Sequence, residues 1–348
     1  MRKQEFITLK WHRIVKFFWL LLLTLTFLGG TEVKIASYNV ENLFDMNDDG
    51  NEYEQYIPNT SWGWNEEMHR IKLRNTAQVI KDIGADIIGL QEIESETALK
   101  ELKAQLSRQG LYYPYYAFAK KKNSAVAVAL LSRYPIKSAL SHTVSSSRVY
   151  RDILETKIDI NGKILRVYVN HWKSKSGPES MRIESAKVLK KIILNVNDPY
   201  ILLGDFNSDY EEYKLFVRNR KHNDTDGKTG INHILKTIDD DQNPISYTAL
   251  QTCNDYLYNL WYDVENNERW SHKFKGNSEA LDNMIISPAL ADGKGIDYVR
   301  GSFKRFDKPY LMYKEKPYRW QQSRNAPKHH TGEGYSDHLP ITAILRVD

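Results

Sequence analysis

The chain has 348 residues, enough for one large α/β enzyme, so its length does not require two domains. With 41% hydrophobic and 27% charged residues, its composition is that of an ordinary globular protein and excludes the disordered, collagen-like and polytopic membrane classes. The single cysteine, Cys253, excludes an intramolecular disulfide framework and a cysteine-rich zinc site. Most of the net charge of +5 belongs to residues 1–30, so overall basicity is not evidence for a nucleic-acid partner.

Residues 1–30 have the pattern of an export signal. A basic stretch ends at Lys16, an apolar run follows from Phe17 to Leu28, and Gly29-Gly30 comes next. Twelve residues are too few for a standard membrane span. We therefore expect a cleaved signal peptide and an exported protein, periplasmic or secreted. An uncleaved segment that tethers the protein to the membrane, or a buried apolar segment, remains an alternative.

The rest of the chain, 31–348, contains no long linker, low-complexity tract or internal repeat, which favours one domain. Apolar periodicity of three to four residues predicts helices at 65–82, 96–109 and 178–195. Asn161-Gly162 is a strong two-residue hairpin signal. This hairpin and the two helices flanking residue 86 together imply a mixed sheet. Strands are predicted at 34–38, 86–90, 125–131, 151–160, 164–170, 200–203, 284–286 and 341–347.

Polar clusters stand at the ends of six of these strands. In a mixed sheet, the exits of strands running one way and the entries of strands running the other share one rim, so the clusters are expected to converge there. Each cluster alone is equally well explained as a turn, a helix cap or a solvent-exposed segment that leads into a helix. Together they supply the amides, carboxylates and imidazoles of an oxygen-ligated divalent metal site with acid–base groups beside it. The clusters are Asn39 to Asn42, Gln91-Glu92, Asn170-His171, Asp205 to Asn207, Asp282-Asn283 and Ser336 to His338.

These clusters carry a resemblance to a known family. The sequence resembles the endonuclease/exonuclease/phosphatase superfamily, the metal-dependent phosphodiesterases and phosphatases related to DNase I and exonuclease III. The ENLFD continuation, RDIL at 151–154 and GYSDH further resemble a bacterial branch described as exported endonucleases. The resemblance implies a four-layer α/β/β/α sandwich, with two mixed sheets face to face and helices outside. The matching motifs are SYNVENLFD at 37–45, LQE at 90–92, VNHWKS at 169–174, GDFN at 204–207, LDN at 281–283 and YSDHLP at 335–340.

The resemblance also implies roles for the oxygen ligands. Glu92 looks like the principal metal carboxylate, with the amide of Asn39 beside it and Asp337 contributing to the metal cluster. Hard oxygen ligands fit Mg²⁺, or Mn²⁺ as a substitute, better than zinc. Asp205 is expected to hold and deprotonate the attacking water, and Asn207 to hydrogen-bond the phosphate or that water.

The two histidines of the motifs receive different expected roles. His338 is expected to contact the scissile phosphate, with Asp282 orienting its ring. His171 resembles the histidine that sits across the phosphate in the DNase I and phosphatase branches, where exonuclease III-like enzymes place a tyrosine, and this leans away from abasic-site repair. Phosphate or substrate contacts are expected from Asn170, Arg151, Lys173 and Arg182, which lie near His171 in the chain.

Two charged regions leave alternatives open. Asp45, Asn47 and Asp49 match the first half of a calcium-loop pattern, but Tyr56 stands where a bidentate Glu is required, so a solvated acidic loop is favoured over a structural Ca²⁺. The stretch 296–328 has nine Lys or Arg with interleaved aromatic residues. It either follows a nucleic-acid strand or packs its aromatic residues onto the sandwich with its charges in water.

The expected function is that of an exported Mg²⁺-dependent nuclease acting on DNA or RNA. The alternatives are the same chemistry on a small phosphoester, such as an inositol phosphate, a nucleotide or a phospholipid headgroup, and a binding module that has lost catalysis. The intact Glu92, Asp205, Asn207, Asp337 and His338 argue against the last alternative. We expect a monomer with a nucleic acid or other phosphoester as its substrate and no protein partner.

Overall fold

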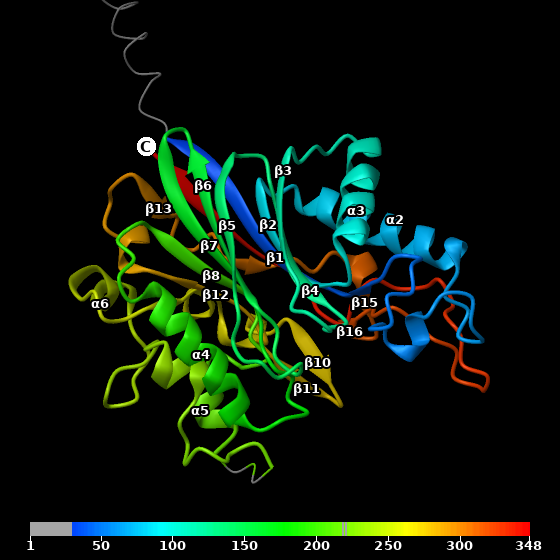
Figure 1. The fold of residues 1–348 in the computed structure, drawn as a ribbon. Coiled ribbons are helices and arrows are strands. Elements are labelled where there is room, and N and C mark those ends of the chain that lie inside the picture. Colours follow the sequence, from blue (N-terminus) through cyan, green and yellow to red (C-terminus); the bar gives the residue numbers. More distant parts are fainter. Residues whose placement is uncertain (1–29, 218, 220) are drawn as a thin grey trace, which may run out of the picture.

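A computed structural model describes residues 30–217, 219 and 221–348 of the chain (Figure 1). The expected export signal at 1–30 therefore lies outside the described residues, apart from Gly30, and stays a prediction. In the described part of the chain, no helix has both the length and the apolar character needed to cross a membrane.

Two large mixed sheets form the centre of the molecule. In the first sheet β1 runs parallel to β2 and antiparallel to β17, and in the second β7 runs parallel to β8 and antiparallel to β6. The first sheet has the order β13 (Ile296–Tyr298), β17 (Ile341–Val347), β1 (Thr31–Leu43), β2 (Ile87–Ile93), β4 (Ala127–Ser132) and β3 (Tyr115–Ala119), with β14 (Lys304–Arg305) also paired to β17. The second has the order β5 (Ile136–His142), β6 (Ile153–Ile160), β7 (Lys163–His171), β8 (Tyr200–Asp205), β12 (Asp282–Ile286) and β9 (Tyr258–Asn259).

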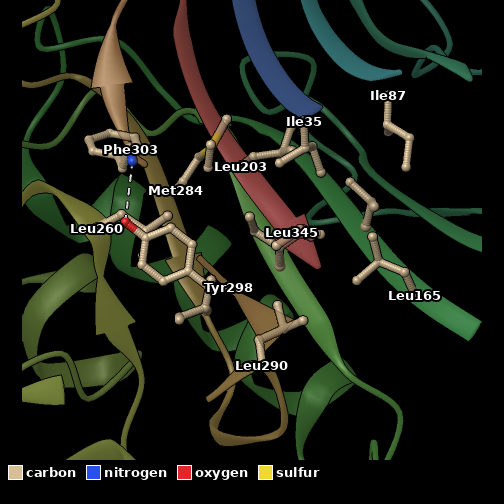
Figure 2. Close-up of a cluster of buried hydrophobic side chains, with 14 of the residues drawn as sticks. Ile35, Ile87, Leu165, Leu203, Leu260, Met284, Leu290, Tyr298, Phe303 and Leu345 are labelled. Carbon is tan, nitrogen blue, oxygen red and sulfur yellow. Dashed lines mark hydrogen bonds between the residues drawn. The ribbon is translucent and has the colours of Figure 1, made fainter. Parts of the chain in front are cut away.

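The two sheets pack face to face through an apolar core. Alternate residues of the strands point into it, because successive side chains of a strand face opposite sides of the sheet. Figure 2 shows Ile35, Ile87 and Leu345 of the first sheet with Leu165, Leu203 and Met284 of the second. At Gly89 in β2 the two sheets lie close together. A Cβ at this position would lie 2.3 Å from Cδ1 of Leu203 in β8, so only glycine leaves enough room.

Helices cover the outer faces of the two sheets. Behind the first sheet, α2 (Glu66–Ile83) and α3 (Glu96–Arg108) pack on the side chains that face away from the central core, such as Ile88 and Leu90. Asn65 begins α2 by accepting hydrogen bonds from two backbone N–H groups of its first turn, and Gly84 ends it in the left-handed region. Behind the second sheet lies α4 (Glu179–Ile193), which packs on Tyr168 and Leu202 (Figure 1).

The remaining regular elements are short. Besides short helical turns, they are α5 (Glu212–Leu215), α6 (Tyr247–Thr252), a hairpin of β10 (His272–Phe274) and β11 (Asn277–Glu279), and a hairpin of β15 (Met312–Tyr313) and β16 (Lys316–Pro317). The β10–β11 hairpin is the yellow projection to the right of α4 and α5 in Figure 1.

This arrangement confirms the expected α/β/β/α sandwich and the mixed sheets. The three long helices begin and end within two residues of their predicted bounds, and each predicted strand is present. Strands β3 and β5 were not predicted, and neither were the short strands β9, β13 and β14. Half or more of the residues of β3 and of β5 are partly or fully exposed, so these two sequences lack the apolar run that marks a central strand.

Candidate active site

Seven side chains from six strand ends meet at one rim of the sandwich. Asn39 and Glu92 stand near the carboxyl ends of β1 and β2, and His171 and Asp205 end β7 and β8. Asp282 begins β12 directly opposite Asp205, and Asp337 and His338 precede β17. We call these seven residues the rim cluster. The predicted convergence of the strand-end motifs is therefore present in the structure.

Backbone geometry at the strand ends sets the direction of these side chains. The pairing of β1 with β2 is irregular between Asn39 and Leu43, and Glu92, in the same region of β2, has a φ of 66°. Such bulges redirect side chains at the edges of active sites. Gly204 has a φ of 135°, and a Cβ on it would lie 2.0 Å from the carbonyl oxygen of Asn170. Glycine is thus required where β7 and β8 come closest, directly before Asp205.

The centre of the rim cluster is a group of carboxylates around one amide and two imidazoles. The Nδ2 of Asn39 donates to Glu92 Oε1 at 3.2 Å and to Asp205 Oδ2 at 3.1 Å. His171 Nε2 lies 3.7 Å from Glu92 Oε1 and 3.6 Å from Asp205 Oδ2, and His338 Nε2 lies 3.9 Å from Asp205 Oδ2. The amide and both imidazoles thus each lie within 3.9 Å of the Asp205 carboxylate.

His338 is held by a carboxylate that is itself held by a hydroxyl group. Its Nδ1 lies 2.7 Å from Asp282 Oδ2, and Ser271 Oγ donates to the same oxygen at 2.6 Å. The ring of His272 packs against that of His338 with centroids 4.7 Å apart. Because Asp282 binds Nδ1, the Nε2 of His338 faces the rest of the rim cluster. The expected orienting contact from Asp282 is present.

Burial and neighbouring charges perturb the titration of these groups. Burial first, opposed by His338 and reinforced by Asp282, raises the pKa of Asp205 to about 7. Burial and the neighbouring Asp337 raise the pKa of Glu92. Although burial opposes it, Asp282 and Asp205 raise the pKa of His338 well above its ordinary value. At neutral pH His338 is therefore cationic.

His171 has the opposite character. Burial, with smaller effects from Arg151 and His338, lowers its pKa well below the ordinary value, and its Nδ1 is buried with no hydrogen-bond partner in the described structure. At neutral pH this imidazole is uncharged and offers one N–H donor.

Asp205 and Asn207 form a local pair in the turn after β8. Asn207, with a φ of 48°, donates its backbone N–H to Asp205 Oδ1 at 2.8 Å and its Nδ2 to Asp205 Oδ2 at 3.1 Å. A second bond from Nδ2 to the carbonyl oxygen of Trp172 ties the turn to the end of β7. Asn207 thus fixes the direction of the Asp205 carboxylate.

The donor set of the rim cluster fits a divalent cation with hard oxygen ligands. Glu92, Asp205 and Asp337 supply carboxylates, and burial together with their mutual repulsion makes the ionised forms of Glu92 and Asp205 unfavourable without a cation. Asp205, Asp282 and His338 each offer a ligand atom within 4.8 Å of the others, and so do His272, Asp337 and His338.

The orientation of Asn39 differs from what a metal ligand requires. Its Oδ1 accepts a hydrogen bond from the backbone N–H of Glu41 at 3.0 Å, and its nitrogen faces Glu92 and Asp205. In this arrangement the amide bridges the two carboxylates. To offer its oxygen to a cation, the amide would have to turn over and release Glu41.

Two of the expected substrate contacts are wrong. Arg182 is fully buried on the inner side of α4, where its Nε donates to Glu179 Oε2 at 2.6 Å and its Nη1 to carbonyl oxygens of the preceding loop. Asn170 is also fully buried. Its Nδ2 donates to backbone carbonyl oxygens, and its Oδ1 accepts from the indole of Trp172. Both residues shape the scaffold beneath His171 and do not face solvent.

The acidic loop after β1 is not arranged as the calcium-loop pattern would require. Asp45 is buried, with one carboxylate oxygen accepting from the N–H of Asn47 and the other from Ser95 Oγ. The acidic groups that lie together are instead Asp49, Glu52 and Glu94. Asp45 thus connects the loop to the start of α3, which is a structural role.

The stretch 296–328 mainly packs onto the sandwich. Tyr298, Phe303 and Trp320 are buried, and Arg305 lies over the ring of Trp270 while pairing with Glu268. The packing alternative therefore describes these three aromatic residues, whereas Tyr313 is exposed.

The contact between Arg319 and Glu41 was missed by the sequence analysis. Arg319 Nε donates to Glu41 Oε1 at 2.9 Å, and its Nη2 lies 3.6 Å from Asp337 Oδ2. Beneath them Lys72 is fully buried and donates to the carbonyl oxygens of Val40 and Tyr335. The one signal available was the acidic residue two positions after Asn39, which gives no indication of a partner 278 residues away.

Two hollows with basic linings flank the rim cluster. One, of about 280 Å³, is lined by Tyr53, Arg148, Arg151 and Lys173 among others, and we call it the Arg148 hollow. The second, of about 430 Å³, is lined by Glu41, Arg319, Arg324 and Lys328 among others, and we call it the Arg319 hollow.

Comparisons with known proteins agree with this fold. The chain matches the Endonuclease/Exonuclease/phosphatase family over residues 34–347. TDP2 from Caenorhabditis elegans is similar with a TM-score of 0.53 and 16% identity, covering 92% of this chain and 76% of that one. TDP2 from D. rerio, complexed with a single-strand DNA product, has a TM-score of 0.54 and 12% identity, covering 91% and 100%. A family protein from Bacteroides thetaiotaomicron has a TM-score of 0.51 and 17% identity, covering 92% and 99%.

At these sequence identities, the similarity to solved structures establishes a shared fold only. A search of curated proteins finds no significant match. The family match spans nearly the whole described chain and includes every residue of the rim cluster. The chain therefore belongs to the Endonuclease/Exonuclease/phosphatase family of metal-dependent enzymes, and it is a hydrolase of phosphoester bonds.

Proposed function

We propose that this protein is an exported, Mg²⁺-dependent nuclease that hydrolyses phosphodiester bonds of DNA or RNA. The observation that carries the proposal is the meeting of Glu92, Asp205 and His338 around one point. Export rests on the basic and apolar pattern of residues 1–30.

Glu92 and Asp337 would hold the cation, together with Asn39 once its amide turns. Their hard oxygen donors favour Mg²⁺, with Mn²⁺ as a substitute. When bound, the cation neutralises charge on a phosphoryl oxygen and fixes the phosphate in place.

Asp205 is the proposed general base. Its pKa of about 7 suits a group that must accept a proton at neutral pH, and Asn207 fixes the direction of its carboxylate. As the water oxygen bonds to phosphorus, one water proton passes to Asp205 and the bond from phosphorus to the leaving oxygen breaks.

The two histidines address the phosphate from separate positions. Cationic His338 donates from Nε2 to a phosphoryl oxygen, because Asp282 occupies its Nδ1. Neutral His171 donates one hydrogen bond to the leaving oxygen. Since His171 carries no extra proton at neutral pH, it stabilises charge there, and the leaving oxygen takes its proton from solvent.

The nucleic-acid preference rests on the basic linings of the two hollows. Phosphates of a polynucleotide are bound mainly by Arg and Lys, and the hollows present Arg148, Arg151 and Lys173 on one side and Arg319, Arg324 and Lys328 on the other. TDP2 from D. rerio, which shares this fold, is complexed with a single-strand DNA product, and this supports the proposal.

The purified protein is tested on plasmid DNA, a single-stranded RNA and a phosphomonoester, with Mg²⁺ or with EDTA. We expect cleavage of a polynucleotide that requires Mg²⁺ and weakens as salt is raised, because phosphate contacts release counterions. Glu92→Gln is the matched variant, since it keeps the size of the side chain and removes the charge. Phosphate release from the monoester without cleavage of either polynucleotide would refute the nuclease proposal.

A further inference from the structure

The Arg148 hollow adjoins the rim cluster through Arg151. The Nη1 of Arg151 donates at 3.3 Å to the carbonyl oxygen of Trp172, the residue that follows His171. The hollow therefore begins within one side chain of the place where the scissile phosphate is proposed to lie.

The three cations of this hollow have no carboxylate partners. In the described residues, no Asp or Glu oxygen lies within 4.0 Å of the charged nitrogens of Arg148, Arg151 or Lys173, although many other Lys and Arg side chains make such contacts. Lys173 reaches only Ser176, and burial together with Arg151 and Arg182 lowers the pKa of Lys173. In the described structure these three side chains therefore make no ion pair.

The Arg319 hollow on the other side differs in this respect. Its innermost cation, Arg319, is already bonded to Glu41 and lies 3.6 Å from Asp337. An anion there would compete with two carboxylates, whereas an anion in the Arg148 hollow would meet three unpaired cations.

We propose that the Arg148 hollow is a subsite for a second phosphate group of the substrate, adjacent to the phosphate that is cleaved, with Arg148 as a specificity-determining residue. This inference rests on the proposed function and adds to it a preference for substrates that carry two phosphates. The second phosphate is either the next phosphate of a nucleic-acid strand or that of a bisphosphorylated small molecule.

Binding is measured first, because it does not depend on turnover. Asp205→Asn protein is titrated with a dithymidine dinucleotide that has or lacks a terminal phosphate, and separately with inositol bisphosphate and inositol monophosphate. We expect the added phosphate to tighten binding about tenfold, the effect of one charge-assisted hydrogen bond. Preference in the dinucleotide pair assigns a strand phosphate, and preference only in the inositol pair assigns a small bisphosphate. Equal affinity within both pairs would overturn the subsite.

The Arg148→Ala substitution then identifies the side chain. In the Asp205→Asn background, Arg148→Ala should remove the preference for the added phosphate, because Arg148 is exposed and makes no ion pair in the described structure. The matched control is Arg70→Ala, an exposed arginine of α2 outside both hollows, which should keep the preference. A preference that survives Arg148→Ala would overturn the role of Arg148. If the wild-type protein hydrolyses no phosphodiester but the added phosphate still tightens binding, only the proposed function would be refuted.

Discussion

The contact between Asp282 and His338 makes the sharpest test of the proposed chemistry. Asp282→Asn keeps the shape of the side chain but removes the charge that, with Asp205, raises the pKa of His338. The amide oxygen can still accept from Nδ1 of His338 at the present distance of 2.7 Å. The pKa of His338 should then fall, so that more of the imidazole is neutral at a given pH, and in the neutral form its Nε2 has no hydrogen to donate to the phosphate.

The size of the effect follows from the lost interaction. A hydrogen bond to a charged group contributes about 1.5–3 kcal/mol, and loss of a positioned proton donor costs ~10²–10⁴ in rate. We expect kcat to fall at least ~10²-fold at neutral pH. Activity requires protonated His338, so kcat falls as the pH rises through the pKa of His338. Because this pKa is lower in Asp282→Asn, kcat of the variant should begin to fall at a lower pH than kcat of the wild type. Lowering the pH should therefore restore part of the lost kcat.

The assay is kcat against pH for hydrolysis of a phosphodiester by the wild-type and Asp282→Asn proteins at saturating Mg²⁺. Thermal unfolding of both proteins provides the control for folding, because Asp282 is buried. An unchanged profile with kcat within twofold of the wild type would refute the role of Asp282 and, with it, the need for a cationic His338.

Three further predictions follow from the site and its scaffold. Asp205→Asn and His338→Ala should each lower kcat by ~10² or more without loss of fold, measured by steady-state kinetics and circular dichroism, and near-wild-type turnover would remove the assigned role. Mg²⁺ affinity, measured by calorimetry, should fall as the pH is lowered, because burial and Asp337 raise the pKa of the proposed ligand Glu92 and cation binding must displace its proton. An affinity independent of pH would contradict this reasoning. Arg182→Ala should lower the free energy of unfolding in urea by about 3–5 kcal/mol, since it leaves Glu179 buried and unpaired, whereas Lys187→Ala in an exposed pair of the same helix should cost under about 1 kcal/mol.

The central strands and helices could be predicted because they carry local signals. The strand at Ile341–Val347 is buried at nearly every position, and the helix at Glu66–Ile83 has both a capping asparagine and a terminal glycine. Strand β5 has no such signal, since most of its side chains face solvent. Its strand conformation comes from pairing with β6, which is a tertiary effect.

The contrast between local signals and tertiary effects also applies to the site. The motif residues of the rim cluster directly follow or precede apolar strands, and the ends of such strands can be predicted from the sequence. The contact of Arg319 with Glu41 joins residues 278 positions apart and has no local signal. Arg182 was expected to contact the substrate because it lies near His171 in the chain. In the structure it lies on the same side of α4 as the buried Ala186 and Leu189. Its spacing from those apolar residues could have indicated burial.

The most direct test of the account is to locate the cation. Crystals of the protein grown with Mn²⁺ would be measured for anomalous scattering, and the Glu92→Gln protein would be measured in the same way. We predict a single strong peak at the rim cluster, within coordination distance of the Glu92 and Asp337 carboxylates and lost in the variant. A peak bound elsewhere, or one at the rim that persists with full occupancy in Glu92→Gln, would contradict the assignment of this site as the catalytic metal centre.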